Sequence, residues 1–429
     1  MKKKFLVSIA IFFLNIFGMK TQAQGISGHV TPQTADFVKY GETPVSLFAG
    51  KMNLEVPIYR IKDRDFDIPI SLIYTSDGFK PEKRSDLVGL DWTLKAGGCI
   101  TREVYGTPDD SKLISSEQEM GYLATLQRTN YSYPKDKVWN FDPSIVLPDN
   151  SFQSYYLKYV DGCFVDYQPD LFMFNFNGHT GHFMINSDGT AIANDKGYKV
   201  DISGLTIQNI YQNSAPQVST LKITAPDGYI YEFGGLLDKL EYSISFRQGT
   251  MLTVGTVNPV ILAWHLSKIT APNGRMVNFN YLTADIGSIN TTSTKQNPIW
   301  QSGKGTLTEG ISAAQATKKA IIESIEVDNV KIEFKKSIET TLITNGSDNG
   351  VFFLDHADFN RASYQLDNII IKYNTTPLYK YKLTYENKNK RRFLSSVIQP
   401  NGSKYEFTSH KLSLPQCTTS NRHLWLLDT

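Results

Sequence analysis

Hydrophobic and polar residues alternate with a period of two along most of the chain, which is the pattern of strands that bury one face. The segments NLEVPIYRI (53–61) and IPISLIY (68–74) both alternate in this way, and the charged residues KDRD (62–65) lie between them. Two alternating runs on either side of a short polar turn predict a β-hairpin.

The following segments extend this pattern and add glycine at positions where the backbone must turn. LDWTLKAGGCITREV (90–104) alternates up to its two adjacent glycines (97–98), where we expect a bulge or a sharp bend. LFMFNF (171–176) places three phenylalanines on one face before an Asn-Gly turn (177–178), and an Asp-Gly pair (188–189) marks a second turn. We interpret this region as a meander of aromatic-rich strands.

A weak internal repeat is centred on the triplets Pro-Asp-Gly and Pro-Asn-Gly. It occurs in Leu221 to Phe233, Leu266 to Tyr281 and Leu394 to Phe407, each with an apolar strand, the triplet and a returning aromatic strand. Proline fixes φ, Asp or Asn tolerates the next turn position, and glycine takes the positive φ that closes the hairpin. The triplets indicate either a stacked wall of hairpins or ordinary β-turns, and 321–334 and 364–386 are two further hairpin candidates.

Signals for helix are scarce. Ser115 to Leu126 has a capping-box arrangement of Ser116 with Glu119 and predicts one short surface helix. Residues 287–320 are rich in Ser, Thr, Gly, Gln and Asn without a hydrophobic period, so we interpret them as a long polar loop.

These patterns together predict an all-β fold of aromatic-rich antiparallel meanders and hairpins, sandwich-like or shell-like, with minor short helices. The chain of 429 residues is long enough for sizeable hydrophobic cores. We divide it into a signal peptide (1–23), an N-terminal β region (24–110), a β-rich region with one short helix (111–286), the polar loop (287–320) and a β-hairpin region (321–429).

The N-terminus has the pattern of a secretory signal peptide. Met1 to Lys4 is basic, and Phe5 to Phe17 is an apolar run too short to span a bilayer as a helix. We expect cleavage after Ala23, so that Gln24 begins a mature protein that is secreted or held at the cell envelope, with no transmembrane segment.

Composition and charge exclude several classes of protein. Hydrophobic residues make up 41% of the chain and charged residues 20%, which argues against a disordered chain. Without the four lysines of the signal peptide the charge changes from +2 to −2, because 40 basic and 42 acidic side chains remain. A nearly neutral surface argues against nucleic acid as a partner.

Cysteine usage points to no metal or disulfide framework. Cys99, Cys163 and Cys417 are widely spaced and odd in number, without the spacing of a zinc site. An exported protein could join Cys99 to Cys163, and buried thiols that act as small hydrophobic side chains are the other reading.

No motif of a known reaction class is present, because the chain has no nucleophile elbow, phosphate-binding loop or zinc-protease helix. His179 and His182 are three residues apart among turn residues, which favours a solvated turn over a pair of metal ligands. Asp109 and Asp110 follow a proline, and a polar turn explains them more simply than a catalytic carboxylate pair.

The alternating acids Asp63, Asp65 and Asp67 imitate the start of a calcium loop. Such a loop needs glycine at its sixth position, where this chain has Ile68, and glutamate at its twelfth. We therefore expect a charged hairpin tip, and predict no catalytic, cofactor-binding or metal-binding residues and no cofactor.

Several segments resemble the N-terminal region of large secreted RHS/YD-repeat proteins of Bacteroidetes-type bacteria. These segments are KYGETPVSLFAGKMNLEVPIYRI, DIPISLIYTSDGFK, LVGLDWTLKAGGCITREVYGTPDD, QPDLFMFNFNGHTGHF and the Pro-Asn-Gly hairpins. A more distant similarity runs to the N-terminal part of toxin-complex B components. The most specific piece is VGLDWTLKAGGCITR, in which Asp91 stands where that family usually has glycine before the tryptophan.

The resemblance implies a non-catalytic β-rich segment that leads into a hollow shell of YD-repeat hairpins around a C-terminal effector. This chain shows neither the repeat array nor the effector, and its ending, KLSLPQCTTSNRHLWLLDT (411–429), resembles a frame-shifted or degenerate tail. We therefore expect a truncated or degenerate member of the family.

Three functions remain after the sequence analysis. The first is an exported structural module of an RHS/YD-repeat-type system, whose partners are other proteins of that export or toxin system or copies of itself. The second is a cell-surface module that binds glycans or proteins through exposed aromatic side chains. The third, a secreted hydrolase, has no motif to support it.

Overall fold

A computed structural model of the protein describes twelve stretches of the chain, almost all of them strands joined by tight turns. These are residues 53–76, 85–112, 118–126, 157–160, 163–166, 168–209, 218–247, 259–282, 287–295, 309–339, 363–388 and 391–408. The predicted signal peptide and the segment 411–429 lie outside the described residues. The predicted all-β fold is confirmed.

The first element is a three-stranded antiparallel sheet that begins with the predicted hairpin. Its strands are β1 (Asn53–Lys62), β2 (Asp67–Thr75) and β3 (Trp92–Lys95). Five of the residues that the alternation places inward, Val56, Ile58, Ile68, Ile70 and Leu72, are buried. Leu54, placed on the same row, is 39% exposed near the start of β1.

A large antiparallel sheet follows, and it contains the predicted meander of phenylalanine-rich strands. Its order is β11-β10-β9-β4-β17-β16-β20-β19. The strands span Ala191–Ala193, His179–Ile185, Leu171–Phe176, Gly98–Glu103, Pro259–Thr270, Leu240–Arg247, Glu309–Lys318 and Gly287–Lys295.

A second large antiparallel sheet contains the repeated hairpins. Its order is β12-β14-β15-β17-β18-β21-β22-β23-β24-β25-β26. Apart from β17, the strands span Lys199–Asp201, Val218–Thr224, Ile230–Leu236, Met276–Tyr281, Ile322–Val327, Val330–Glu339, Ser363–Tyr373, Thr376–Lys388, Arg391–Ile398 and Lys404–Glu406.

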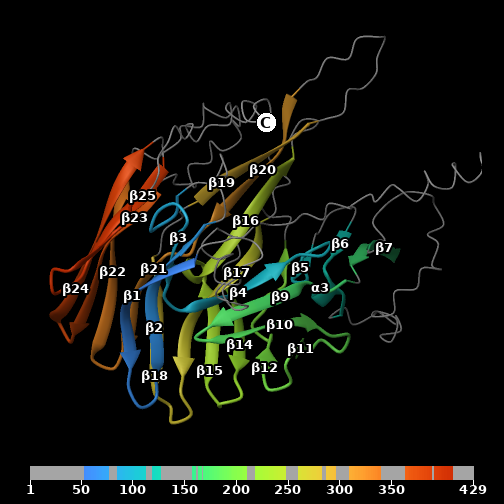
Figure 1. Ribbon diagram of the computed structural model, residues 1–429. Coiled ribbons are helices and arrows are strands. Elements are labelled where there is room, and N and C mark those ends of the chain that lie inside the picture. The colour runs from blue at the N-terminus through green and yellow to red at the C-terminus, as the bar shows by residue number, and fades with distance from the viewer. Residues whose placement is uncertain are drawn as a thin grey trace, which may run out of the picture.

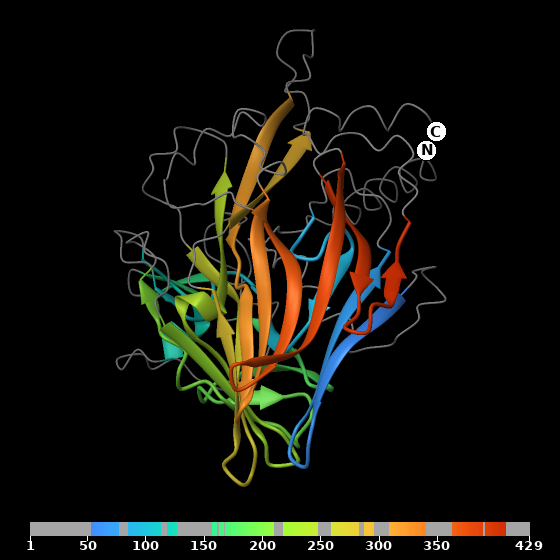
Figure 2. The ribbon, with the colours of Figure 1, turned by 90° about the vertical axis from the view of Figure 1, so that its left-hand side faces the viewer.

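Strand β17 belongs to both large sheets. Its first half pairs with β16 and β4, and its second half pairs with β15 and β18. Trp264, at the change of partners, is fully buried and donates its indole N–H to Ser219 Oγ at 2.8 Å. Figure 1 shows β17 in the middle of the molecule, between β9–β12 and β22–β25, and Figure 2 shows the curvature of β22–β25 beside the β1–β2 hairpin.

The second sheet has one apolar and one charged face, which the strand register shows directly. One row of paired positions across eight strands is apolar: Val200, Ile223, Tyr231, Ile269, Val277, Val327, Val330 and Tyr373. The adjacent row, on the opposite face, is polar: Asp201, Lys222, Glu232, Lys268, Asn278, Glu326, Lys331 and Lys372. An antiparallel sheet with one solvated face has this alternation.

The three sheets share one continuous hydrophobic core, which extends from Val56 on β1 to Val397 on β25. The glycine pair after β3 acts as the predicted bend, because β3 pairs with β2 whereas β4 pairs with β9 and β17. The chain therefore passes from the small sheet to a large one at Gly97 and Gly98.

The three predicted triplet turns are confirmed and are nearly identical. In each, the glycine N–H donates to the carbonyl three residues earlier, at 2.9 to 3.0 Å, and the glycine φ is +84° to +86°. In each, the Asp or Asn side chain accepts the backbone N–H two residues later. A glycine is favoured there because other residues rarely adopt positive φ.

A small sheet and a short helix stand beside this core. The sheet has the order β13-β5-β6-β8-β7, with strands Gln208–Asn209, Ser111–Lys112, Gln118–Met120, Cys163–Asp166 and Leu157–Val160, and two of its pairings are parallel. The helix is α3 (Tyr122–Leu126), and a single 3₁₀ turn, η3 (Leu237–Lys239), precedes β16. None of the helical segments among the described residues is long and apolar enough to cross a membrane.

The predicted helix over Ser115 to Leu126 is too long. Residues Gln118–Met120 form β6, which pairs with β5 and β8, and the helix begins only at Tyr122. The amides of its second and third residues, Leu123 and Ala124, donate to the carbonyl oxygen of Asp109 at 3.0 and 3.2 Å. Ser116 of the predicted capping box lies outside the described residues.

The prediction of a polar loop over 287–320 is wrong for its two ends. Gly287–Lys295 forms β19 and Glu309–Lys318 forms β20. The two strands pair with each other, and β20 also pairs with β16. Strands pair through backbone N–H and C=O groups, and every residue except proline supplies both. A strand rich in Ser and Thr can therefore pair although its sequence has no hydrophobic period. Threonine also has a high preference for strands.

Candidate functional site

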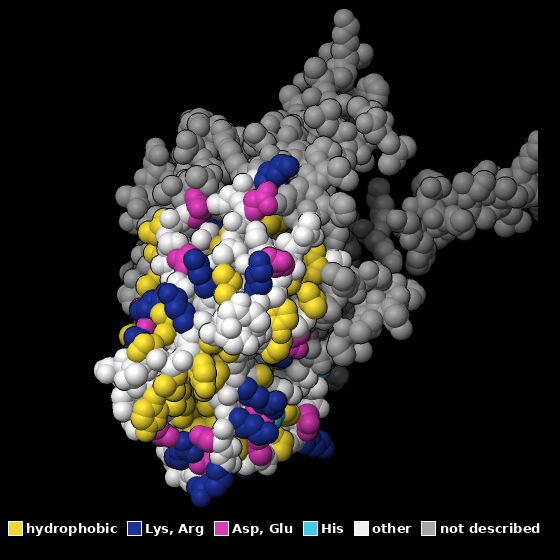
Figure 3. All heavy atoms as spheres, turned by 60° about the vertical axis from the view of Figure 1, so that its left-hand side comes forward, with side chains coloured by type: hydrophobic (Ala, Val, Ile, Leu, Met, Phe, Trp, Pro, Cys, Tyr) yellow, Lys and Arg dark blue, Asp and Glu magenta, His cyan; other side chains and the backbone are white. Residues whose placement is uncertain are grey.

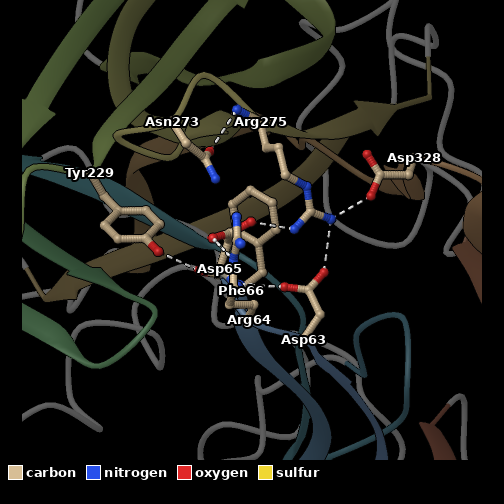
Figure 4. Close-up of polar contacts among 8 residues, drawn as sticks. All are labelled: Asp63, Arg64, Asp65, Phe66, Tyr229, Asn273, Arg275 and Asp328. Carbon is tan, nitrogen blue, oxygen red and sulfur yellow. Dashed lines mark hydrogen bonds and ion pairs between the residues drawn. The ribbon is translucent and has the colours of Figure 1, made fainter.

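Four hairpin tips meet at one end of the molecule, and Arg275 lies at their centre (Figure 4). Arg275 follows the turn between β17 and β18. Asp63 and Asp65 are on the tip between β1 and β2, Asp328 is on the tip between β21 and β22, and Tyr229 is on the tip between β14 and β15. We call this group the tip junction.

The guanidinium of Arg275 binds all three carboxylates of the tip junction. Nη1 donates to Asp65 Oδ2 at 2.5 Å and Nη2 donates to Asp63 Oδ2 at 2.9 Å. Nη2 also donates to Asp328 Oδ2. One cation thus joins the three-stranded sheet to two hairpins of the second large sheet.

Aromatic side chains support the same contact. The guanidinium carbon of Arg275 lies 5.2 Å from the centre of the Phe66 ring, and Phe66 meets the edge of Tyr229 with ring centres 6.3 Å apart. The Tyr229 hydroxyl donates to the backbone carbonyl of Asp65. These contacts hold the β1–β2 tip by its backbone as well as by its charges.

The ion pairs lower the pKa of the acids that they contain. The hydrogen bond from Arg275 is the main cause that holds the pKa of Asp65 at about 2. For Asp63, partial burial acts to raise the pKa, but hydrogen bonds from Arg275 and from the Phe66 and Asp65 amides lower it below its ordinary value. The predicted charged hairpin tip is therefore an ion-pair centre.

A second polar group is enclosed in the core between β4, β9 and the loop after β4. Arg102, Asp109, Asp110, Asp166 and Asp170 are all buried. Arg102 Nη1 lies 2.6 Å from Asp110 Oδ1 and 3.6 Å from Asp170 Oδ2, and its Nε donates to the carbonyl of Ile261 at 2.9 Å. We call this group the buried acid cluster.

The carboxylates of the buried acid cluster bind backbone amides. Asp109 N–H donates to Asp170 Oδ2 at 2.9 Å, and Asp170 N–H donates to both oxygens of Asp109 at 3.1 Å. Asp170 Oδ1 accepts the amide of Tyr105, and Asp166 Oδ2 accepts the amide of Thr107. The acids thus fix the loop 105–110 to the segment before β9.

Burial shapes the protonation of this cluster. It raises the pKa of Asp170 to about 7, although Arg102 and two amides act in the opposite direction. Burial and the neighbouring Asp170 raise the pKa of Asp109 well above its usual value. Buried carboxylates close together share protons in this way.

The structure brings Asp109 and Asp110 into one cluster, with both side chains removed from solvent. Both side chains are enclosed: Asp110 Oδ1 accepts a hydrogen bond from Arg102, and both Asp109 oxygens accept the Asp170 amide. The polar turn expected from the sequence is therefore a buried structural contact.

His179 and His182 do not form a ligand pair. Both lie on β10, where residues three apart face opposite sides, and His182 is exposed. His179 is half-buried against Phe176, and its Nδ1 is 2.9 Å from the Tyr198 hydroxyl. Burial lowers the pKa of His179, so the neutral imidazole is favoured.

Cys99 is a fully buried thiol, which agrees with its interpretation as a small hydrophobic side chain. Burial raises its pKa well above the ordinary value. Among the residues that the structure describes, no three His, Cys, Asp or Glu side chains are arranged to hold a metal ion.

The segment that carries the family resemblance forms a third junction, between the loop before β3 and strand β25. Leu90 N–H donates to the carbonyl of Arg392 at 2.8 Å, and Arg392 N–H donates to Ser85 Oγ at 2.7 Å. Asp91 then adopts a φ of +64°, a conformation that favours glycine.

Sequence reasoning missed the partners that complete both polar groups. The members of each group lie in separate segments of the chain, and only the fold brings them together: Arg275 with Asp328 in the tip junction, and Arg102 with Asp170 in the buried acid cluster. A signal was present for one of them, because Arg102 is a charged residue at an inward position of a predicted strand (90–104).

Comparison with known proteins gives no family for this chain. No protein-family model matches it, and no curated protein matches it in sequence.

Among solved structures, the chain has distant similarity to toxin-complex chains and to an effector domain. The crystal structure of TcdB2-TccC3-Cdc42 aligns with a TM-score of 0.37 and 10% identity over 83% of this chain and 15% of that chain. The N-terminal domain of effector protein SpvB from Salmonella typhimurium strain LT2 aligns with a TM-score of 0.33 and 10% identity over 83% and 99%. A Photorhabdus luminescens Tc holotoxin pore aligns with a TM-score of 0.31 and 11% identity over 83% and 15%. The chain thus spans about 15% of the length of the first of these toxin chains.

Proposed function

We propose that this chain is an exported, non-catalytic structural module, the N-terminal shell or scaffold segment of an RHS/YD-repeat-type system. The observation that carries the proposal is the run of hairpins in the second large sheet, three of which use one turn geometry. Successive hairpins that bury one face and repeat one turn are suited to building a wall.

The polar groups of the chain support a structural role. In the tip junction, Arg275 joins its own hairpin tip to two others. In the buried acid cluster, the carboxylates bind Arg102 and backbone amides. Groups bound in this way stabilise a shape and are poorly placed to exchange protons with a substrate.

In this role the chain is exported by its N-terminal segment and acts through contact with other proteins of the same system or with copies of itself. N-terminal sequencing of secreted or envelope material should begin at or next to Gln24. Mature material that retains Met1 would contradict the export step.

Cross-linking in the cells that make the protein tests the scaffold role. The tagged full chain is cross-linked in place, purified under denaturing conditions and digested, and the linked peptides are identified by mass spectrometry. We expect links from the described strands to a protein that carries YD repeats. If no cross-link to a YD-repeat protein is found and the chain is monomeric in the medium, the proposed scaffold function is contradicted.

A further inference from the structure

Four tyrosines from three strands gather on the side of the molecule that carries β22–β24. They are Tyr59 on β1, Tyr379 and Tyr381 on β24, and Tyr405 on β26, and we call them the tyrosine platform. The rings of Tyr59 and Tyr379 have centres 6.3 Å apart with planes inclined by 40°. Figure 3 shows apolar side chains gathered in one area low on this side, among scattered charged residues.

The rings of the tyrosine platform are accessible to a ligand. Tyr379 is 47% exposed and Tyr405 is 39% exposed, while Tyr59 and Tyr381 are partly buried. Burial, followed by the neighbouring hydroxyls of Tyr59, Tyr379 and Tyr405, raises the pKa of Tyr381. The pKa of Tyr59 is raised by burial and by Tyr379. The hydroxyls of Tyr59 and Tyr381 therefore stay protonated at neutral pH and can donate as well as accept hydrogen bonds.

The platform is uncharged because of strand alternation. Lys380 and Lys382 alternate with Tyr379 and Tyr381, so the ammonium groups project from the opposite face of β24. On β1, the residue after Tyr59 is Arg60, whose guanidinium is bound to Asp67. An anionic ligand would find no cation among the platform side chains themselves.

The size of the platform favours a small ligand over a stable protein interface. At roughly 200 Å² for an aromatic side chain, the exposed parts of these four rings amount to roughly 200 to 300 Å². A standard protein interface buries about 800 Å² on each partner. One or two sugar rings match the smaller area.

We propose that the tyrosine platform is a binding site for a neutral saccharide. The apolar C–H faces of the sugar rings pack on Tyr379 and Tyr405, and the tyrosine hydroxyls hydrogen-bond to sugar hydroxyls. The inference goes beyond the scaffold function and does not depend on it, because a scaffold without this site would still pass the cross-linking test.

The test uses the full chain, a glycan array of neutral and acidic structures, and calorimetric titration. The titrated probes are cellotetraose, maltotetraose, chitotetraose and mannotetraose, with a heparin tetrasaccharide as the anionic probe. We expect at least one neutral probe to bind, and the double variant Tyr379→Ala/Tyr405→Ala to weaken that binding at least about tenfold. Tyr379→Phe should retain most of it, because the ring face remains.

The matched control is Ile192→Ala/Leu236→Ala, which removes two exposed apolar side chains on other strands and should leave binding unchanged. The proposal is overturned if no neutral glycan binds on the array or in titration, if only the heparin probe binds, or if the tyrosine double variant binds like the unaltered chain. It is also overturned if the double variant abolishes self-association instead, since the platform would then be a protein interface.

Discussion

Arg102 and Asp110 form an ion pair with both side chains removed from solvent, and their Nη1 and Oδ1 atoms are 2.6 Å apart. Arg102 also lies over the Trp264 ring, 5.1 Å from its centre, and so links β4 to the strand shared by both large sheets. Burial acts to lower the pKa of Arg102, but the negative charges of Asp110 and Asp170 outweigh it. The pKa is therefore raised above its ordinary value, and the guanidinium stays charged.

Replacing Arg102 should be among the most damaging single changes. Arg102→Met leaves the buried acids without their counter-charge, and breaking a buried pair typically costs about 3–5 kcal/mol of unfolding free energy. Urea denaturation measures this loss. The control Lys331→Met breaks a half-exposed pair with Glu326, which should cost about 1 kcal/mol or less. Equal losses in the two variants would contradict the structural role of Arg102.

Stability should fall as the pH rises from about 4 to about 7. The pKa of Asp170 is about 7 in the folded protein against an ordinary value of 3.8, so between these values the folded state holds a proton that the unfolded chain releases. The unfolded state is therefore favoured increasingly until the pH passes the folded pKa. Denaturation at a series of pH values measures the slope.

The matched variant for this pH effect is Asp170→Asn, which cannot ionise. It should be less stable overall, because Asn can accept only one of the amide hydrogen bonds from Tyr105 and Asp109. Its stability should nevertheless vary less between pH 4 and pH 7. An unchanged slope would show that Asp170 is not the group that titrates.

The tip junction should act in the opposite direction at acid pH. The pKa of Asp65 is about 2, below its ordinary value, so its contribution is present above about pH 4 and is lost as the pH falls towards 2. Arg275→Gln should reduce stability above pH 4 and flatten the profile below it. Arg64→Gln is the control, since Arg64 is exposed and makes only a 3.3 Å contact with Asp65. If the unaltered chain, Arg275→Gln and Arg64→Gln all lose stability in the same way between pH 4 and pH 2, the tip junction is not the cause of that loss.

Gly98 is required by close packing. An added Cβ would lie 2.4 Å from the Cβ of Phe176 and 2.5 Å from the carbonyl oxygen of Asn175, so Gly98→Ala should cost about 2 kcal/mol or more. Gly274→Ala is the contrasting variant, because its added Cβ meets nothing within 4 Å and only its φ of +86° is strained, which costs about 1 kcal/mol. Thermal denaturation ranks the two, and a larger loss at Gly274 would contradict the packing argument.

The hairpins could be predicted from the sequence because their causes are local. Alternation over 53–61 and 68–74 predicts the buried residues Val56, Ile58, Ile68, Ile70 and Leu72, and the glycine at position 228, 274 or 402 closes its turn. A strand such as β19 has polar residues and no period, so nothing in its sequence distinguishes it from a loop.

The two polar groups could not be predicted because their causes are distant in the sequence. Asp63 meets Arg275 only after the three-stranded sheet has packed on the second large sheet. Asp109 meets Asp170 only after β4 and β9 have paired. A single sequence contains no information on which of its many acids will be enclosed with which arginine.

Native-state hydrogen exchange tests most directly whether the molecule is one structural unit, as its proposed scaffold role requires. Peptides from β9, β17 and β25 report on the first large sheet, the shared strand and the far end of the second sheet. Because one core and one shared strand join them, their slowest amides should exchange with the same free energy of opening, equal to that of global unfolding. A markedly lower opening free energy for β25 than for β9 and β17 would show that the hairpin wall unfolds separately, and would contradict the account.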